Sequence, residues 1–572
     1  MDRFVLAAVT AAAFFSCATP QGASSLATEN FPSRESVKGL TARPVRLDVA
    51  KISSDVVDSW ELAGPFPQAL GAINVQPTTD WEKELATVAP STARAFTEDH
   101  RCIAREIARY YASRKQYPGH SLQRFIELRC ATTADRVAFK GFSGTVPAGM
   151  SDADWFAQAK GSLAKMGNIG NPELVGIAAA RDGERGAVVI VTGEAGAIFP
   201  RPVPNSVAGM KSIELRGKMA HGSALRLEAR INQGALESVG CRTLDAASPP
   251  EFAFTCDVAP GDTRTVVEVA AFDEGRLFGR KVVDLVVWPT AAPTNTWSRA
   301  KGSSDVPTGL LASRFVSEVN ALRTRAGLPS LTEVPEQSAT ATLLAPHYFA
   351  SQFGQTDPLE ADAIALAMMA GWDVGLDIVS SGFGSSWLSG TRDLALFVEF
   401  LLDSPFQRFA VTDKRATHIA VGTFEDPTSL AALFATYVPL GTFDRPAAET
   451  AVITRLNTLR RDRGLPLAQW TRWPIDEGAL VAQKLGAREW TPRDASQYIL
   501  QTTAGVSHGE VVGYTQLVDD LEHFQFPPEV LTRQDVNVFL SVSTYRAEEW
   551  AHTRYVVCFV LAKPGDVQTA SR

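Results

Sequence analysis

The side chains best suited to chemistry in this sequence are two pairs of a histidine and a glutamate, His347 with Glu360 and His508 with Glu510. An imidazole near a carboxylate can act as a general acid and base when both reach the same bond of a substrate. Such pairs would support hydrolysis of a peptide or a glycan. We assign no catalytic residue, and these four are the candidates only if the chain is a hydrolase.

Other catalytic patterns are missing from the sequence. It contains no His-Glu-x-x-His, phosphate-binding loop or dinucleotide fingerprint, and we expect no cofactor. The run from Gly382 to Trp387 is not a Gly-x-Ser-x-Gly elbow and no strand clearly precedes it, which predicts a loop. His347 lies beside Tyr348 on a predicted helix, where a hydrogen-bonded core or rim histidine is the commoner role. His100 and His120 each stand alone on a polar helix or loop and are expected at the surface.

The elements that must position these residues include an internal repeat, since residues 315–331 return as residues 452–468, 137 positions later. Six identities at one offset mark two copies of one structural unit. They are Asn320, Leu322, Arg323, Gly327, Leu328 and Pro329, which recur as Asn457, Leu459, Arg460, Gly464, Leu465 and Pro466. The apolar spacing predicts a helix with its arginines outside, and the glycine and proline predict where it ends.

A helix, Gly-Leu-Pro and an inward turn resemble the opening of the CAP superfamily domain (cysteine-rich secretory proteins, antigen 5, pathogenesis-related 1). Ser404, Pro405, Gln407 and Arg408 belong to a segment similar to the family's Ser-Pro-Gly-His-Arg, and residues 417–422 are similar to its Thr-His-Ile-Gly-Val-Gly strand. The resemblance covers residues 308–440 of the first copy. Residues 535–545 and 554–563 supply the strand pair of the second copy. The resemblance implies an α-β-α sandwich in each copy.

The sequence departs from the family at its metal cavity, where bacterial members usually carry two His and two Glu. Gln355 stands in the Phe-x-His place, Leu376 and Asp377 fall near the Glu-Asn place, and Gln407 replaces the second histidine. Amides in place of imidazoles remove the nitrogen ligands of a zinc-type site, and we predict no metal. The second copy has no Ser-Pro-x-x-Arg, and His508 and Glu510 lie in its shortened middle, where they have no clear alignment.

The first residues resemble the export signal of a bacterial lipoprotein. Residues 1–17 combine a short charged start with about a dozen apolar residues, too few to cross a bilayer, and end at Cys17. Phe14 to Cys17 resembles a lipobox, although Leu is usual where Phe14 stands. Cys17 is therefore the expected lipidation site, followed by a flexible tether. The alternative is ordinary cleavage, with a secreted or periplasmic protein. No later segment is long and apolar enough for a transmembrane helix.

The remaining cysteines fit an oxidising compartment. Local pairing of Cys102 with Cys130 and of Cys241 with Cys256 is expected, although four cysteines allow three connectivities. Cys558 alternates into a predicted buried strand face, where it is expected as a small core residue.

Two further regions precede the repeat. Residues 90–200 predict helices followed by a hairpin at 174–180 and 187–192, an order that also fits a third, strongly diverged CAP-like copy. After Phe199, five short alternating segments separated by turn residues predict a small β-sandwich with immunoglobulin-like architecture.

The predicted fold class is a multidomain α/β and β protein, with tandem CAP-like α-β-α sandwiches after the β-sandwich. A chain of 572 residues with 45% hydrophobic content suits three or four domains. The net charge of −8 argues against a nucleic-acid partner. The predicted boundaries are a signal peptide at 1–17, a tether at 18–45, an N-terminal α/β region at 46–200, the β-sandwich at 201–289, a linker at 290–308, and CAP-like domains at 309–445 and 446–566.

The preferred function is a cell-surface binding or scaffold protein, held at the outer membrane by its lipid, whose CAP-like grooves bind an envelope or extracellular peptide, glycan or lipid. A domain that was kept and duplicated while its metal ligands were lost favours binding over catalysis. The alternative is an envelope hydrolase with a rearranged His/Glu site, since Glu360 follows Gln355 closely and could face the same cavity. A purely structural role in surface assembly is a third hypothesis. The sequence does not determine the ligand or the oligomeric state.

Overall fold

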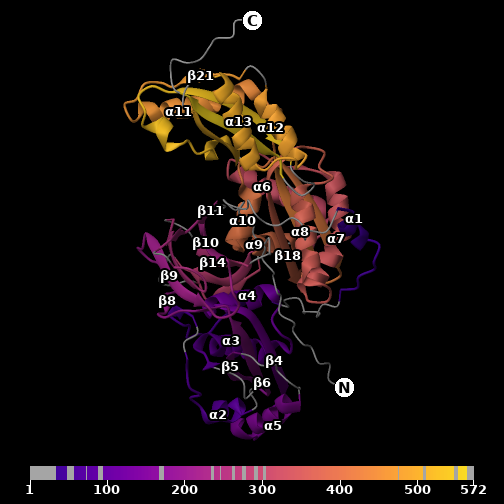
Figure 1. The fold of residues 1–572 in the computed structure, drawn as a ribbon. Coiled ribbons are helices and arrows are strands. Elements are labelled where there is room, and N and C mark those ends of the chain that lie inside the picture. Colours follow the sequence, from indigo (N-terminus) through magenta and orange to yellow (C-terminus); the bar gives the residue numbers. More distant parts are fainter. Residues whose placement is uncertain are drawn as a thin grey trace. The chain divides into compact units, whose positions relative to one another are not determined.

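The chain folds into two compact units in a computed structural model (Figure 1). One unit is Met1–Met368 with Gly382–Thr436, and the other is Met369–Ser381 with Tyr437–Arg572. The residues described are 34–47, 57–71, 74–87, 95–165, 173–233, 237–244, 247–259, 265–273, 279–288, 294–299, 305–473, 476–506, 511–518, 520–546 and 552–562.

The first α/β region is a four-stranded sheet with helices on both faces. Its elements are α2 (Asp80–Ala86), β3 (Ala95–Phe96), α3 (Glu98–Arg114), α4 (His120–Arg129), β4 (Ala134–Thr145), α5 (Asp152–Lys165), β5 (Leu174–Asp182) and β6 (Arg185–Ala195). The strand order is β3-β5-β6-β4, and only β3 and β5 are parallel. Leu174 and Ala178 join the core under α3 and α4, while Val175 and Ile177 join the core under α5. Alternate residues of a strand point to opposite faces, so helices cover both sides. The predicted hairpin is confirmed.

A β-sandwich follows, built from two four-stranded sheets that share one core. Its strands are β7 (Ala197–Ile198), β9 (Ser212–Met219), β10 (Arg226–Gln233), β11 (Glu237–Gly240), β12 (Arg242–Thr243), β13 (Glu251–Asp257), β14 (Thr265–Phe272) and β15 (Arg280–Val287). Strand β8 (Val203–Pro204) lies between β7 and β9 in the sequence but belongs to neither sheet. The sheets have the orders β11-β10-β14-β15 and β12-β13-β9-β7. The five predicted strand segments coincide with β9, β10, β13, β14 and β15.

Short elements before and after the sandwich pair with each other. β2 (Ala69–Leu70) pairs with β8, and β1 (Ser59–Glu61) pairs with β16 (Thr296–Ser298), which falls inside the predicted linker. Trp297 on β16 is buried. Helix α1 (Arg34–Leu40) lies within the stretch expected as a tether and contacts α7. Residues 34–40 of the stretch expected as a tether are therefore helical.

The first copy of the repeat again has a four-stranded sheet, in the order β17-β19-β20-β18. Its elements are α6 (Leu311–Arg325), β17 (Thr332–Glu333), α7 (Pro335–Gln352), α8 (Pro358–Ala370), β18 (Ile378–Ser389), α9 (Leu394–Asp403), α10 (Pro405–Thr412), β19 (His418–Asp426) and β20 (Ser429–Pro439). The loop expected at Gly382 to Trp387 is wrong, because these residues lie within β18. Its glycines are needed for packing, since a Cβ on Gly384 would lie 2.4 Å from the ring of Phe434.

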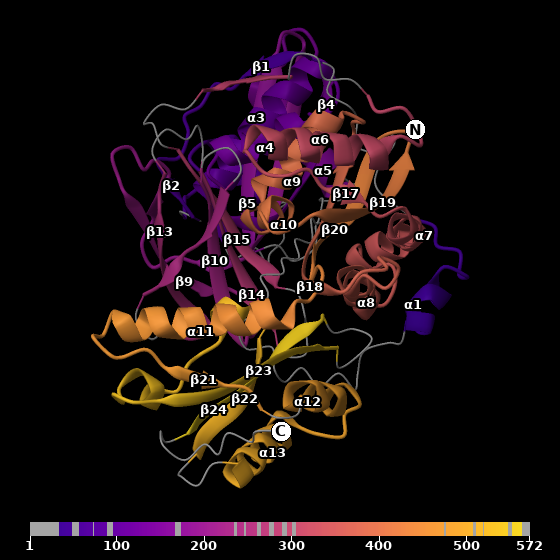
Figure 2. The same ribbon diagram turned by 90° about the horizontal axis from the view of Figure 1, so that it is seen from above.

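The second copy has the order β21-β23-β24-β22. Its elements are α11 (Arg445–Arg461), β21 (Gln469–Thr471), α12 (Glu477–Gly486), α13 (Pro492–Val506), β22 (Val511–Val518), the 3-10 turns η2 (Leu521–His523) and η3 (Pro528–Leu531), β23 (Asn537–Tyr545) and β24 (Arg554–Ala562). Val538, Leu540 and Val542 pack in the core with α11, whereas Phe539 packs with α12 and α13. Figure 2 shows α11 on one side of this sheet and α12 and α13 on the other.

The three α/β regions share one succession of elements. In each sheet a short first strand runs parallel to the third strand in sequence, which pairs with the fourth, and the second strand closes the far edge. A helix follows the short strand directly in all three, as α3, α7 and α12. The two copies of the sequence repeat and the first α/β region, which lacks that repeat, therefore have the same strand connectivity.

The repeated arginines are buried, contrary to the expectation that they lie outside. Arg323 is 1% exposed and donates from Nε to Pro329 O (2.7 Å), and from its terminal nitrogens to Val411 O (2.7 Å), Asp413 O (3.1 Å) and Ala416 O (3.0 Å). A guanidinium has five N–H donors in a fixed fork and can satisfy several carbonyls at once. The arginine fastens the end of its helix to the loop before the third strand.

Arg460 makes the same contacts in the second copy. It donates to Pro466 O (2.7 Å), Val530 O, Arg533 O (3.1 Å) and Gln534 O (2.8 Å). The repeated asparagines also act alike, because Asn320 and Asn457 each accept from the backbone amide eleven positions later, at 2.7 and 2.8 Å. The repeated residues are therefore structural.

Glycines allow the central helices to approach the sheets closely. A Cβ on Gly176 of β5 would lie 2.0 Å from the carbonyl carbon of His100 on α3, and one on Gly422 of β19 would lie 2.4 Å from that of Ala341 on α7. In the last region the glycine is on the helix, where a Cβ on Gly478 of α12 would lie 2.2 Å from Ser541 Oγ on β23.

Candidate functional site

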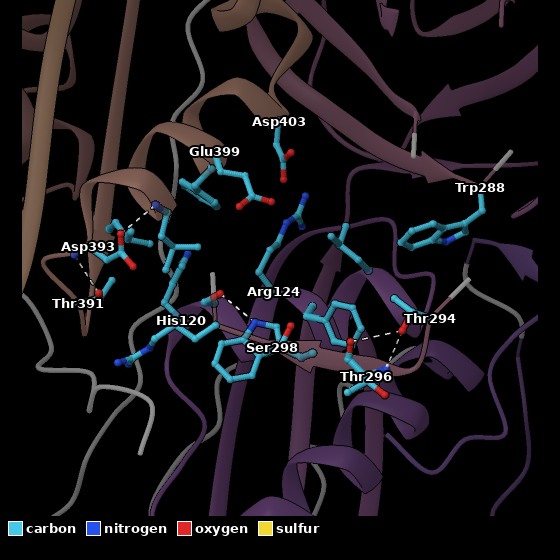
Figure 3. Close-up of a pocket in the computed structure, with 18 residues that line it drawn as sticks. His120, Arg124, Trp288, Thr294, Thr296, Ser298, Thr391, Asp393, Glu399 and Asp403 are labelled. Carbon is cyan, nitrogen blue, oxygen red and sulfur yellow. Dashed lines mark hydrogen bonds between the residues drawn. The ribbon is translucent and has the colours of Figure 1, made fainter. Parts of the chain in front are cut away.

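A cavity of about 300 Å³ lies within the first unit (Figure 3). The lining comes from α4, from Trp288 and the short stretch 294–299 that contains β16, and from the end of β18 with α9. The lining residues are His120, Ser121, Arg124, Phe125, Leu128, Trp288, Thr294, Thr296, Trp297, Ser298, Arg299, Leu388, Thr391, Asp393, Leu396, Glu399, Phe400 and Asp403.

The two helices present one face to the cavity because their other face packs in a core. On α4, Leu122 and Ile126 are buried against the first sheet, while His120 and Arg124, one turn apart, line the cavity. Helix α9 begins at Asp393, whose Oδ1 accepts hydrogen bonds from the amides of the next turn. Its buried residues are Leu394, Phe397, Val398, Leu401 and Leu402, and the cavity residues Leu396, Glu399, Phe400 and Asp403 fall between them.

Arg124 is the positive centre of this site. It donates to Asp284 Oδ2 on β15 at 2.8 Å, and its side chain lies 3.7 Å from Glu127. Figure 3 shows its guanidinium reaching toward Asp403 and Glu399. Burial alone would raise the pKa of Asp284, but Lys281 and Arg124 outweigh it and hold that pKa at about 2. The Arg124–Asp284 ion pair therefore persists across the physiological pH range.

His120 is buried, with 6% of its surface exposed, although it was expected at the surface. Within the described part of the chain, neither ring nitrogen has a hydrogen-bond partner. The ring contacts Phe400 edge to face, with the centroids 5.0 Å apart. Burial, and then the charge of Arg124, lowers the pKa of His120 to about 4, so the imidazole is neutral at neutral pH. A neutral imidazole offers one donor and one acceptor to whatever enters the cavity.

Tryptophans form the wall opposite α9. The indole N–H of Trp297 donates to Ser121 Oγ at 3.1 Å, which ties β16 to the first turn of α4. Arg129 lies over the ring of Phe66 at 4.2 Å and 5.8 Å from the centroid of Trp288. Cation–π contacts of this kind hold aromatic rings in place. The aromatic wall is therefore fixed by its own neighbours.

The predicted catalytic pair of the first copy is brought together but covered. His347 on α7 is 3% exposed, and Glu360 on α8 accepts from Arg43 at 2.8 Å. The backbone of Arg43 also hydrogen-bonds His347, whose pKa is lowered mainly by burial. The segment after α1 thus lies over both groups. Within the described residues, His347 Nδ1 and Glu360 Oε2 are buried without a partner.

The segment with the family-like motif packs against the β-sandwich. Ser404 caps α10 and donates to Glu268 Oε2 of β14 at 2.6 Å, while Arg408 Nε donates to Leu402 O at 2.9 Å. Pro405 occupies the first turn of α10, and Gln407 is completely buried. These residues therefore serve an interface inside the first unit.

A serine and a histidine also meet in the second unit. Ser381 Oγ and His552 Nε2 are 3.0 Å apart, but the same nitrogen lies 3.2 Å from Met369 O. A carbonyl oxygen only accepts, so Nε2 carries the proton and cannot take one from Ser381. This pair has the wrong tautomer for a nucleophile and its base.

The remaining predictions concern the cysteines, the residues outside the described part of the chain, metal binding and membrane spans. The disulfides Cys102–Cys130 and Cys241–Cys256 form as expected, and Cys558 is a buried free thiol. His508, Glu510 and Cys17 lie outside the described residues. In the described part of the chain, no group of three or more His, Cys, Asp or Glu is placed to hold a metal ion. No described helix has the length and hydropathy of a membrane span.

The cavity was not found from the sequence. Its residues come from three separate stretches, and their spacing on α4 and α9 looks like ordinary exposed helix faces. The only signal was the pair His120 and Arg124 one turn apart on a helix, which is common on protein surfaces.

Comparison with known proteins gives few matches. No protein-family model and no curated protein matches the chain. Similar solved structures include a cysteine-rich secretory protein from Staphylococcus aureus, 8% identical, which covers 43% of this chain and 83% of its own with a TM-score of 0.18. Another is an extracellular protein containing an SCP domain from Bacillus anthracis, 10% identical, which covers 38% of this chain and 89% of its own with a TM-score of 0.17. These scores are too low to assign a fold.

Proposed function

We propose that this chain is an exported binding protein that holds a small ligand in the cavity between α4 and α9, and that it is not an enzyme. The observation that carries the proposal is the cavity itself, about 300 Å³, in which a buried histidine lacks hydrogen-bond partners among the described residues. Small-molecule sites are largely apolar hollows with a few well-placed polar groups. From the sequence we expected a peptide, glycan or lipid in the CAP-like grooves; we now place the ligand in this cavity.

The state of the candidate catalytic groups supports binding over catalysis. Glu360 is paired with Arg43, and His347 is bonded to the backbone of the same residue. A general acid–base pair must reach a substrate, which this covering segment prevents. The envelope hydrolase remains the second candidate, because both side chains keep one buried polar atom without a partner among the described residues.

We further propose that residues 309–445 and 446–566 are tandem CAP-like domains, that residues 46–200 are a third diverged copy, and that residues 201–289 are an immunoglobulin-like module. The shared strand order and the matching contacts of Arg323 and Arg460 support the repeats. Deletion of residues 446–572 should leave a chain that folds alone, whereas aggregation of that product would count against an independent domain.

Export and lipidation at Cys17 are part of the same proposal, with the outer membrane or cell surface as the location. The two disulfides support export, since disulfides persist in oxidising compartments. Labelling cells with a tritiated fatty acid tests the anchor: incorporation should disappear in Cys17→Ser. Equal labelling of the natural chain and the variant would show that Cys17 is not the lipidation site.

A fragment screen by ligand-observed NMR tests the function against its alternative. The full chain should bind fragments that no longer bind His120→Phe but still bind Glu360→Gln. The reverse result, together with turnover of fluorogenic peptide or glycan substrates that is lost in Glu360→Gln, would make the hydrolase the correct function. Absence of any fragment sensitive to His120→Phe would reject the cavity as a binding site.

A further inference from the structure

The aromatic side chains of the cavity offer flat apolar surfaces. Phe125 on α4, Phe400 on α9, Trp297 on β16 and Trp288 directly after β15 contribute to its lining. The face of an aromatic ring carries a partial negative charge, which attracts weakly positive C–H groups packed on it. A sugar ring presents such C–H groups on its faces and hydroxyl groups around its rim. A fatty chain would instead need an apolar wall that is not interrupted by charges.

The polar side chains of the cavity match hydroxyl groups in number and type. His120 has one donor and one acceptor without a partner in the described structure, and Arg124 Nε is a buried donor without one. An unsatisfied buried polar atom carries a free-energy cost, so a ligand that satisfies several of them gains affinity. A hydroxyl group donates and accepts at once, so a ligand with several hydroxyls matches both the donor and the acceptor of the imidazole and the donor of Arg124.

The charge and size of the cavity narrow the class of ligand. Its carboxylates are Asp393, Glu399 and Asp403, and its cations are Arg124 and Arg299. Arg124 is already matched by Asp284 behind the wall, so the lining repels an acidic ligand. The volume of about 300 Å³ lies at the low end of small-molecule pockets, about 300–1,000 Å³, and suits one or two sugar rings.

We propose that the cavity between α4 and α9 binds a neutral monosaccharide or disaccharide, stacked on the tryptophan wall and hydrogen-bonded to His120 and Arg124. This inference rests on the proposed binding function and names its ligand class.

Saturation-transfer NMR on the full chain tests this proposal with glucose, galactose, mannose, N-acetylglucosamine and its disaccharide as probes. Glucuronic acid and choline serve as the acidic and cationic comparisons. At least one neutral sugar should bind, and glucuronic acid should bind more weakly than glucose. His120→Phe, which keeps a ring against Phe400, should weaken binding about tenfold or more because two hydrogen-bonding atoms are lost.

Two glutamate variants keep the test independent of folding defects. Glu399 lies on the exposed side of α9 in the cavity lining, and Glu399→Gln should weaken sugar binding. Glu336 is exposed at the start of α7, and Glu336→Gln should leave sugar binding unchanged. If only choline or glucuronic acid binds, and His120→Phe weakens that binding, the proposal that the ligand is a neutral sugar is wrong but the proposed binding function is retained. If none of these probes binds while fragments still bind in a His120-dependent way, the sugar proposal is also wrong. If neither the probes nor any His120-dependent fragment binds, the proposed binding function itself is rejected.

Discussion

Glu268 lies in the middle of β14 with 2% of its surface exposed, and Ser404 at the start of α10 donates to it. Burial raises the pKa of Glu268 to about 7, although Ser404 and Lys281 act to lower it. Asp284 on the neighbouring strand raises this pKa further. The carboxyl therefore stays largely protonated in the folded chain until neutral pH.

Glu268→Gln should remove part of the pH dependence of stability. The carboxyl ionises near pH 4.5 when unfolded and near pH 7 when folded. At this group the folded state binds more protons in between, so the contribution of Glu268 to the free energy of unfolding falls as the pH rises from 4.5 to 7, by roughly 3 kcal/mol, and stays lower above pH 7. Buried His120, whose pKa is lowered to about 4, contributes in the opposite direction, so the quantity to measure is a difference between chains. In urea unfolding, the difference in the free energy of unfolding between the natural chain and Glu268→Gln should change by this amount across the range, whereas the difference between the natural chain and Glu251→Gln, an exposed control on β13, should stay constant. Parallel curves for all three would mean that Glu268 is already ionised when folded.

At the residue scale the sequence predicted structural roles better than sites. The disulfides were predicted because cysteine pairing depends on few possibilities. His120 was assigned to the surface because the sequence gives no sign of what packs over α4. Its surroundings come from Trp288, from residues 294–299 and from α9, far along the chain. Burial by distant segments is a property of the tertiary fold and leaves no local pattern.

At the scale of secondary-structure elements, the two copies of the repeat share the contacts made at the ends of helices α6 and α11. Arg323 and Arg460 each join the last turns of a helix to four backbone carbonyls, two of them in the loop before the third strand. Gly327 and Gly464, with φ of 72° and 70°, follow these helices as predicted. The helices and their ends were thus predictable from the sequence. The inward direction of the two arginines was not, because an arginine on a helix with an apolar stripe normally lies on the solvent side.

Arg323→Lys should destabilise the first unit by about 2–4 kcal/mol, because one ammonium group cannot reach all the carbonyls and leaves some buried without donors. Arg325→Lys, two positions later and exposed, is the matched control and should change stability by less than about 0.5 kcal/mol. Chemical denaturation monitored by tryptophan fluorescence measures both. Equal effects of the two substitutions would show that the buried hydrogen bonds contribute little.

At the scale of the whole molecule, the two disulfides close loops in different regions. Cys102–Cys130 joins α3 to the end of α4, with a sequence separation of 28, and Cys241–Cys256 lies in the sandwich, with a separation of 15. The first also holds the helix that carries His120. Cross-links restrict the unfolded chain and so favour the folded one.

Replacing both cysteines of a pair by serine should lower the free energy of unfolding by roughly 3–4 kcal/mol for Cys102 and Cys130 and about 3 kcal/mol for Cys241 and Cys256. Thermal unfolding of the two double variants, with Cys558→Ala as the control, measures this. A reducing agent should destabilise the natural chain and leave a chain without the four cysteines unchanged. Identical melting of the natural chain with and without the reductant would refute a stabilising role.

The architecture was more predictable than the site because it depends on local patterns. Alternating strands, helix ends and turn residues placed the β-sandwich and both strand pairs of the repeat. The second strand of each sheet was harder, since β18 is built of Gly and Ser residues whose packing role appears only beside Phe434. The cavity depends on contacts between stretches that lie far apart in the sequence, which no local pattern encodes.

The glycines at the helix–sheet crossings bear on how related chains can be recognised. In two regions the space is made by a glycine on the strand, Gly176 and Gly422, and in the third by Gly478 on the helix. What the three regions share is a short distance between helix and strand backbones, which a glycine on either element can allow. A search that compares residues position by position scores this exchange as two mismatches. Copies of one architecture can therefore drift beyond sequence detection while the spacing of their layers is kept, and searches that score pairs of facing positions should find relatives that single-position comparison misses.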